Sequence, residues 1–210
     1  MTKIDMKKTK KRQDILDGAY QMFTTVGFSK TTILGIARKA SVGKGTFYLY
    51  FDSKEDVRNE LIYLKTSELL EGAIAKLEES AGGKGSSKGS PDEIVEGFIF
   101  VADYILTYLS KDLTLLKFIS KNLTWGLFFS SNHPDTRPEN VINFKEFITR
   151  ILEQYNITLK NPDLLIFTII EMVNSTCYSV LMNDDPVPFE QYKPYLYHCI
   201  RLLVRDAIVE

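Results

Sequence analysis

Apolar residues recur at helical spacing along most of the chain, on one face of each predicted helix. No segment alternates apolar and polar residues as a half-buried strand does. We therefore expect an all-α fold. The helical pattern is interrupted at Gly27, at the glycine- and serine-rich segment 81–90, and near Pro134, Pro162 and Pro186.

These interruptions divide the chain into an N-terminal group of short helices and a C-terminal group of longer ones. The first group is expected over about 8–26, 33–40 and 44–50, followed by a long helix that begins at Ser53. Gly27 stands where a glycine commonly ends a helix, and Thr31 or Thr32 is a good N-cap for the next one. The second group is expected over about 92–109, 112–130, 138–155, 162–183 and 189–208.

Two short helices joined by a tight turn, the second of them basic and aromatic, are the outline of a helix-turn-helix. In the second helix, Phe47 and Phe51 are four residues apart and share one face, so we expect them to point into the core. Lys44 and Tyr48 share a different face, which is expected to point outward. Such a face, with hydroxyl groups nearby, is suited to phosphates and base edges.

Three further features of this segment favour a polyanion. Gly45 lets the backbone approach a groove closely, and Thr46 and Tyr50 add hydroxyls beside the outward face. Lys54 lies in the first turn of the next helix, where free backbone N–H groups favour an anion.

Charge is distributed unevenly although the whole chain has a net charge of only −1. Residues 1–54 contain eleven Lys or Arg and four Asp or Glu, a net charge of +7. Residues 55–210 contain fifteen basic and twenty-three acidic residues, a net charge of −8. The distribution indicates that only the N-terminal part meets a polyanion.

The N-terminal part resembles the DNA-binding domain of TetR-family regulators over roughly residues 9–69, with the recognition motif at about 32–51. The resemblance rests on many spaced positions: Ile15, Leu16, Ala19, Phe23, Gly27, Phe28, Thr31, Thr32, Ile36, Ala37, Ala40, Val42, the run Lys44 to Tyr48, Tyr50, Phe51, Ser53, Lys54 and Glu55. It implies that residues 70–210 form a helical domain for ligand binding and dimerisation.

The resemblance also implies roles for individual residues. Phosphate contacts are expected from Thr31 or Thr32 and from Thr46, Tyr48 and Lys54, whereas Lys44, Gly45 and Tyr50 are expected at or near the bases. The sequence departs from the family pattern at two positions in the turn. Ser41 stands where glycine is usual, and Gly43 stands where serine or threonine is usual. The glycine of the family pattern could have moved from position 41 to position 43. The sequence alone therefore leaves the geometry of this turn open.

The C-terminal part is rich in large aromatic residues and has isolated polar residues on apolar helices. These residues could simply fill a bundle core, or they could line an apolar cavity for a small molecule. The candidate ligand-binding residues are Phe98, Tyr104, Phe118, Asn122, Trp125, Phe129, Glu171 and Asn174. A largely apolar, neutral or weakly polar effector is expected, and a cationic one stays possible with Asp103 or Glu171 as the counter-charge.

The last two helices, 162–183 and 189–208, have broad apolar faces, and the resemblance implies that they form a two-fold homodimer. The faces expected to meet the partner contain Leu165, Ile169, Met172, Val173 and Tyr178 in one helix, and Tyr195, Ile200, Leu203 and Val204 in the other. The apolar stretch 164–182 is broken by Glu171, Asn174 and Ser175, so a buried helix is favoured over a membrane span.

Together these features predict a cytoplasmic repressor that leaves a palindromic double-stranded DNA operator when a small molecule binds. No catalytic, metal-binding or cofactor-binding spacing is present, so we expect neither an enzyme nor a cofactor or metal site. Cys177 and Cys199 are expected to be free thiols. Two alternatives remain: a DNA-binding regulator without small-molecule sensing, and a helical interaction protein that keeps the motif for packing alone.

Overall fold

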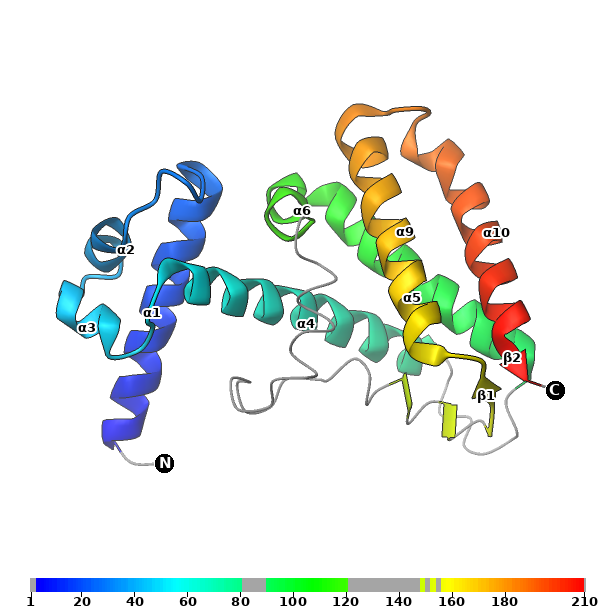
Figure 1. The fold of residues 1–210 in the computed structure, drawn as a ribbon, viewed down its shortest axis with the longest axis horizontal. Coiled ribbons are helices and arrows are strands. Elements are labelled where there is room, and N and C mark those ends of the chain that lie inside the picture. The colour runs from blue at the N-terminus through cyan, green and yellow to red at the C-terminus, as the bar shows by residue number, and fades with distance from the viewer. Residues whose placement is uncertain (1–2, 81–89, 121–147, 150–151, 154–155, 210) are drawn as a thin grey trace. The chain divides into compact units, whose positions relative to one another are not determined.

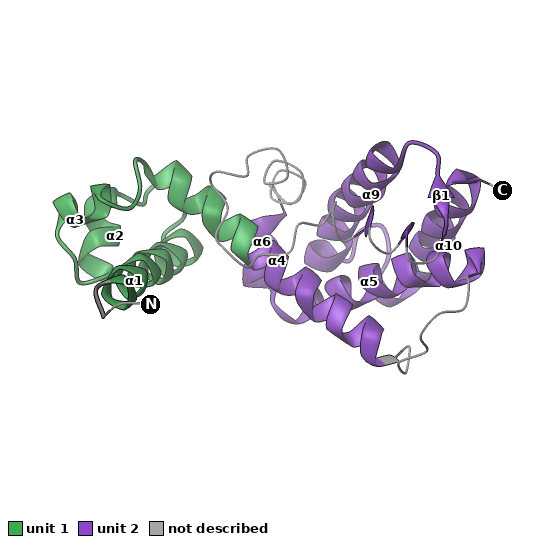
Figure 2. Cartoon of the chain, turned by 90° about the horizontal axis from the view of Figure 1, so that it is seen from below, with its two compact units in different colours: residues 1–64 green, residues 65–210 purple. Residues whose placement is uncertain are grey.

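A computed structural model describes residues 3–80, 90–120, 148–149, 152–153 and 156–209, and within them the chain is almost entirely helical (Figure 1). The chain forms two compact units, Met1–Leu64 and Lys65–Glu210 (Figure 2). The expected all-α class is confirmed. A short antiparallel pair, β1 (Thr158–Leu159) with β2 (Ile208–Val209), is the one addition among the described residues.

The first unit contains α1 (Lys3–Thr25), α2 (Ile33–Lys39), α3 (Lys44–Tyr48) and the start of α4 (Lys54–Ser80). Gly27 has a φ of +90°, which suits a glycine just after the end of a helix. The Thr32 side chain caps α2 by accepting a hydrogen bond from the Gly35 N–H at 3.0 Å. The core of the unit is apolar: Ile15, Leu16, Ala19, Phe23, Ile36, Ala37, Phe47, Phe51, Val57, Leu61 and Ile62.

The turn between α2 and α3 is built at Ser41 and Gly43. Ser41 has a φ of +55°, the left-handed conformation that glycine adopts without strain. Gly43 is the N-cap of α3 with an extended backbone at φ −74° and ψ 153°, and it offers no side-chain cap. The left-handed residue of the turn is therefore Ser41, the position where the family pattern has glycine, and Gly43 has an ordinary extended conformation.

The second unit packs α5 (Pro91–Lys111), α6 (Leu113–Ile119), α9 (Pro162–Asn183) and α10 (Phe189–Ala207) against one another. Helix α5 begins with a capping box between Ser90 and Glu93. The Asp112 side chain caps α6 by accepting from the Leu115 N–H at 2.9 Å. Helix α6 corresponds to the first part of the helix expected over 112–130, and residues 121–130 lie outside the described residues. Most of the helix expected over 138–155 also lies outside them; 148–149 and 152–153 are helical.

Helices α9 and α10 pack into the second unit through residues that the sequence had assigned to the dimer surface. Leu165, Ile169, Ile200 and Val204 are buried in the core of this unit, so that part of the expectation is wrong. Large apolar side chains are nevertheless exposed on the same helices: Leu164, Phe167, Tyr195 and Leu202. By length and composition α9 could also cross a membrane, and only 22% of its most apolar stretch is buried. Helix α9 therefore has one apolar face in the core and a second one uncovered.

Candidate nucleic-acid interface

Helix α3 divides its residues between the core and the solvent as its period predicts. Phe47 is fully buried and its ring centroid lies 6.0 Å from that of Phe51, which is also buried. Lys44 and Tyr48 are exposed on the other side, with the Lys44 ammonium 5.9 Å from the centroid of the Tyr48 ring. The expected inward and outward faces of this helix are confirmed.

Gly45 lies on the exposed surface of α3, and nothing in the described structure requires a glycine there. A Cβ added at this position would have no atom within 4 Å, and its φ is not positive. A glycine within a helix is unfavourable relative to alanine by about 1 kcal/mol. The close approach of something outside the chain therefore remains the best reason for this residue.

The two threonines at the start of α2 differ in exposure. Thr31 is 1% exposed, and its hydroxyl donates a hydrogen bond to the Gly27 carbonyl at 2.8 Å. Thr32 is exposed at the N-terminus of α2. Of the two expected phosphate contacts, Thr31 is ruled out by burial, and Thr32 stays a prediction. Thr46 and Tyr50 are half-buried beside the outward face of α3.

The Lys54 ammonium is engaged within the first unit. It donates to the carbonyls of Phe28 and Thr31, at 3.0 Å each, and lies 4.5 Å from the centroid of the Phe28 ring. Two of its three N–H donors are therefore used to hold the turn before α2. The side chain therefore positions the turn, an internal role that argues against the phosphate contact expected from Lys54.

Other side chains at the start of α4 also bind the rest of the first unit. The Arg58 guanidinium lies 4.5 Å from the centroid of the Phe28 ring. Glu60 accepts hydrogen bonds from both terminal nitrogens of Arg12 on α1. The same guanidinium lies 4.9 Å from the centroid of the Phe51 ring. The first turns of α4 are thus fixed to α1 and to the segment that follows α3.

Leu49 was not among the expected site residues. It follows α3 directly and is 81% exposed, the highest value among the large apolar residues of the described chain that are exposed. From the sequence, a leucine between Tyr48 and Tyr50 would be expected in the core. It is exposed because α3 ends at Tyr48, directly before it. Its position beside the outward face of α3 suits contact with a thymine methyl group.

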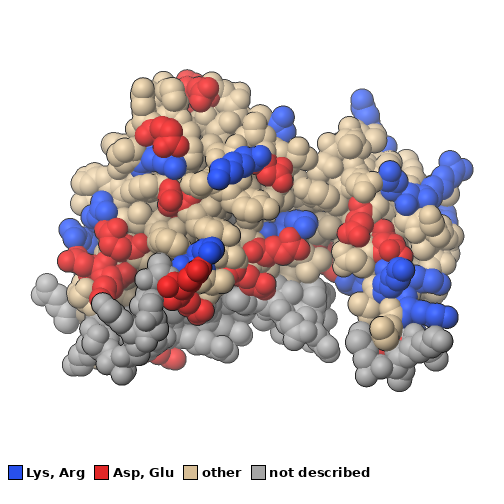
Figure 3. Space-filling view, turned by 180° about the vertical axis from the view of Figure 1, so that it is seen from behind, with Lys and Arg blue, Asp and Glu red and all other residues tan. Residues whose placement is uncertain are grey.

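Basic side chains gather over the first unit in the view of Figure 3, whereas both signs of charge alternate over the second. Exposed lysines of α1 contribute Lys7, Lys8, Lys10 and Lys11, and α2 contributes Arg38 and Lys39. The unit therefore combines a short helix with an outward face and a positive surface, which is the arrangement expected of a duplex-binding module.

Comparison with known proteins agrees with this geometry. Residues 15–61 match the family model for bacterial regulatory proteins of the tetR family. The sequence similarity to this family therefore lies within the N-terminal unit.

Two curated relatives from Bacillus subtilis (strain 168) share this similarity. The uncharacterised HTH-type transcriptional regulator YhgD is 36% identical over 77 residues, which are 37% of this chain and 38% of that protein. The fatty acid metabolism regulator protein is 32% identical over 77 residues, 37% of this chain and 40% of that protein. The matches thus span about two fifths of these relatives.

The whole chain is similar in fold to solved TetR structures. A putative tetR family transcription regulator from Shewanella sp. PV-4 aligns with a TM-score of 0.58 and 18% identity, over 95% of this chain and 99% of that one. The likeness extends the fold assignment to the second unit. Both curated relatives are named as regulators, and the similarity to them covers only the N-terminal part of this chain.

The expected ligand-binding residues of the second unit do not form a single group. Phe98 packs against the larger core cluster and Phe118 against the smaller one. Tyr104 lines a pocket on α5, whereas Glu171 and Asn174 are half-buried on α9 and do not line it. Asn122, Trp125 and Phe129 lie outside the described residues.

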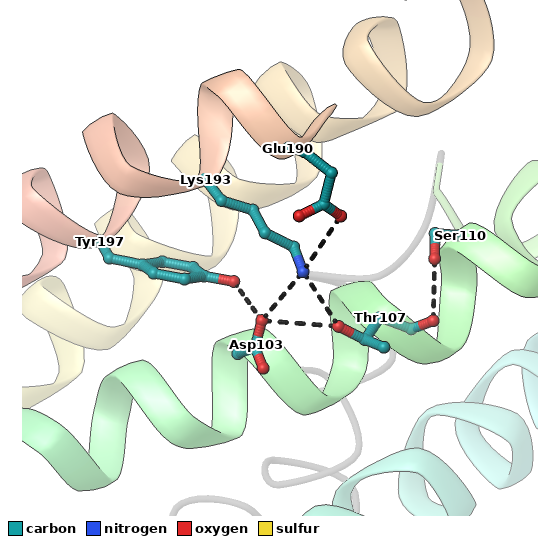
Figure 4. Close-up of polar contacts among 6 residues, drawn as sticks. All are labelled: Asp103, Thr107, Ser110, Glu190, Lys193 and Tyr197. Atoms are coloured by element: carbon teal, nitrogen blue, oxygen red, sulfur yellow. Dashed lines mark hydrogen bonds and ion pairs between the residues drawn. The ribbon is translucent and has the colours of Figure 1, made fainter. Parts of the chain in front are cut away.

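Asp103 was expected as a possible counter-charge for a cationic ligand. It already has a positively charged partner within the chain, Lys193 (Figure 4). Its Oδ1 lies 3.4 Å from the Lys193 ammonium and accepts a hydrogen bond from the Tyr197 hydroxyl. Burial, together with Asp103, raises the pKa of the Tyr197 phenol, so the hydroxyl stays neutral and donates. The same ammonium also lies 3.4 Å from Oε1 of Glu190, so two carboxylates share one positive charge. A cationic ligand at Asp103 therefore stays possible.

Proposed function

We propose that the chain is a sequence-specific transcriptional repressor that binds a palindromic DNA operator as a homodimer. The observation that carries the proposal is the outward face of α3, where Lys44, Gly45 and Tyr48 are exposed while Phe47 anchors the helix in the core. Core packing explains Phe47 but gives no reason for the other three residues. The positive surface of the same unit supplies the affinity for phosphates.

The uncovered apolar face of α9 and α10 supports the homodimer. Leu164 is 66% exposed and Tyr195 is 65% exposed, and Phe167 and Leu202 lie exposed on the same two helices. An extended set of large exposed apolar side chains is uncommon on a soluble monomer and marks an interface. A two-fold dimer would present two copies of α3 to successive major grooves, roughly 34–36 Å apart, and so require a palindrome.

Small-molecule control is the second part of the proposal. A largely apolar ligand in the second unit would displace α4, which continues into the first unit, and so release the operator. A cytoplasmic location, as expected from the sequence, is part of the same proposal. The curated relative named for fatty acid metabolism matches only two fifths of its own length, so it does not specify the ligand.

Selection of bound duplexes from a random DNA pool tests the DNA-binding proposal. We expect a site with dyad symmetry. Selected sites without symmetry, or no enrichment at all, would refute it.

The dimer is tested with Leu202→Glu, which places a charge on the uncovered face. We expect this variant to sediment as a folded monomer and to lose operator binding. Leu113→Glu is the control, because Leu113 is exposed on α6, a helix that contains none of the residues assigned to the interface. A Leu202→Glu variant that remains dimeric would refute the assignment of the interface.

A further inference from the structure

The first turns of α1 extend beyond the packed part of the first unit. Helix α1 begins at Lys3, whereas its first buried side chain among the described ones is that of Ile15. Every side chain from residue 5 to residue 11 is exposed, and the family similarity begins only at residue 15. We call residues 5–11 the basic arm. Packing within the unit gives no reason for this stretch of helix.

Contacts of α1 place the basic arm beyond the C-terminal end of α3. A Cβ built on Gly18 would lie 3.4 Å from the Lys39 Cβ, at the end of α2. Two turns earlier, the Arg12 guanidinium lies 4.9 Å from the centroid of the Phe51 ring, in the segment after α3, and is paired with Glu60. The basic arm continues from Arg12 in the same direction (Figure 1). Its base is thus fixed beside α3, and the rest extends past it.

Four lysines give the basic arm a strong positive charge: Lys7, Lys8, Lys10 and Lys11. Asp5 is its one acidic residue, so the net charge of these seven residues is +3. Among the described residues, none of the four ammonium groups has an ion pair or a hydrogen bond. All four are therefore available to a partner outside the chain.

The lysines of the basic arm disfavour its helix in the free protein. Lys7 is three and four residues from Lys10 and Lys11, and like charges at these spacings destabilise a helix. Cations near the start of a helix are also opposed by its dipole. No apolar face is buried to compensate, although burial is the main source of helix stability in proteins. A polyanion bound along the arm would remove the repulsion between the lysines.

We propose that the basic arm binds the duplex phosphates that flank the base pairs read by α3. This inference rests on the proposed DNA-binding function and adds a second contact region to it. Phosphate contacts fix position and affinity and carry no base sequence, so the arm lengthens the bound site without changing the preferred bases. Seven helical residues span about 10 Å, or about three base pairs. The helix of the arm is more stable on DNA than in the free protein.

The salt dependence of operator binding tests the contact with phosphates. The glutamine variant has Lys7→Gln, Lys8→Gln, Lys10→Gln and Lys11→Gln. One side of the arm faces the duplex, so about two of the four lysines reach phosphates, and the slope of log K against log salt should fall by about 1.8 units per protomer. Operator affinity should fall by roughly tenfold or more at about 0.15 M salt.

Two controls separate the position of these charges from their number and chemistry. Arginine at the same four positions keeps the charge and should keep the wild-type slope. Lys111→Gln with Lys117→Gln removes two exposed lysines of the second unit and should leave the slope unchanged. A decrease of the same size per charge in this second control would overturn the assignment to the arm, because net charge alone would then explain it.

The length of the duplex tests where the arm binds. The selected operator is compared without flanks and with four further base pairs on each side, in two unrelated flanking sequences. We expect the wild type to bind both flanked duplexes roughly tenfold more tightly, and the glutamine variant to bind all three equally. In hydrogen exchange, the amides of the arm should be protected by the flanked operator. A preference for one flanking sequence, or unchanged exchange, would contradict the proposed contact.

The remaining outcomes separate this inference from the function on which it rests. A wild-type protein that selects no operator refutes the DNA-binding function and the arm with it. A wild type that binds its operator, with the same salt slope in the glutamine variant, refutes the arm alone. Binding to phosphatidylglycerol vesicles that the glutamine variant loses, with operator binding unaltered, would assign the arm to a membrane surface instead.

Discussion

Replacing Lys54 with methionine keeps most of the aliphatic stem and removes the ammonium that holds the turn before α2. The wild-type ammonium donates to the carbonyls of Phe28 and Thr31 at 3.0 Å and lies over the Phe28 ring. A hydrogen bond with a charged partner contributes about 1.5–3 kcal/mol net. Lys54 is half-buried, so water can replace part of what is lost. We expect the free energy of unfolding of the first unit to fall by about 2 kcal/mol, less than the roughly 3–6 kcal/mol for two such bonds because water replaces part of the loss.

Two measurements on the full chain separate this role from contact with a phosphate. Unfolding in urea, followed by far-UV circular dichroism, gives the change in stability. The slope of log K for operator binding against log salt concentration counts the phosphates that are neutralised, and we expect it to be unchanged. Lys44→Met is the matched control, because Lys44 is exposed and its ammonium has no hydrogen-bond partner among the described residues. It should unfold within about 0.5 kcal/mol of the wild type.

The opposite pair of results would refute this reasoning. If Lys54→Met unfolds at the wild-type urea concentration and lowers the salt slope by about one unit per protomer, the ammonium neutralises a phosphate. Its two carbonyl contacts would then contribute nothing measurable to the fold.

Three other substitutions or treatments test separate features. Lys44→Ala should change the bases preferred in a DNA selection, at a cost of about 1–3 kcal/mol for the preferred site; an unchanged selected sequence would contradict its place near the bases. Ser41→Gly should raise the free energy of unfolding by about 1 kcal/mol, because Ser41 has a φ of +55°; a loss of stability in urea would contradict the strained turn. Burial raises the pKa of the Cys177 thiol to about 11, so it stays protonated at pH 8 and should resist iodoacetamide until the chain unfolds, as peptide mass spectrometry would show.

Features that depend on local sequence were predicted well. Asn161-Pro162 and the prolines before Phe189 fixed the start of α9 and α10, and both helices were expected within one residue of their observed ends. The inward Phe47 and the outward Lys44 follow from the period of a single helix. These elements need no information about which other segment they pack against.

Features that depend on packing between segments were not predicted. Lys54 reaches carbonyls 23 and 26 residues earlier in the chain, so its role exists only once α4 crosses the turn before α2. Helix α9 is apolar on more than one face, and no period shows which face its own unit buries; Leu165 lies in the core and Leu164 is exposed. The contact between Gly72 and Tyr104 likewise joins helices that a 3.6-residue period treats separately.

Helix α4 offers a test of the proposed small-molecule control, because this one continuous helix contains both Lys54 and Gly72. Lys54 and Glu60 fix its first turns to the DNA-binding unit, and Gly72 touches Tyr104 eighteen residues after Lys54, about 27 Å along the helix axis. A displacement at Gly72 can move the first unit only if the first turns of α4 hold that unit firmly. Gly72→Ala would push Tyr104 and α4 apart, because its Cβ would lie 2.7 Å from the Tyr104 hydroxyl oxygen, and we expect it to weaken operator binding. Lys54→Met should therefore reduce the effect of Gly72→Ala on operator affinity, and the two effects should not add. Additive losses would show that the two contacts act independently, and would mean that the Lys54 contact takes no part in carrying the displacement to α3.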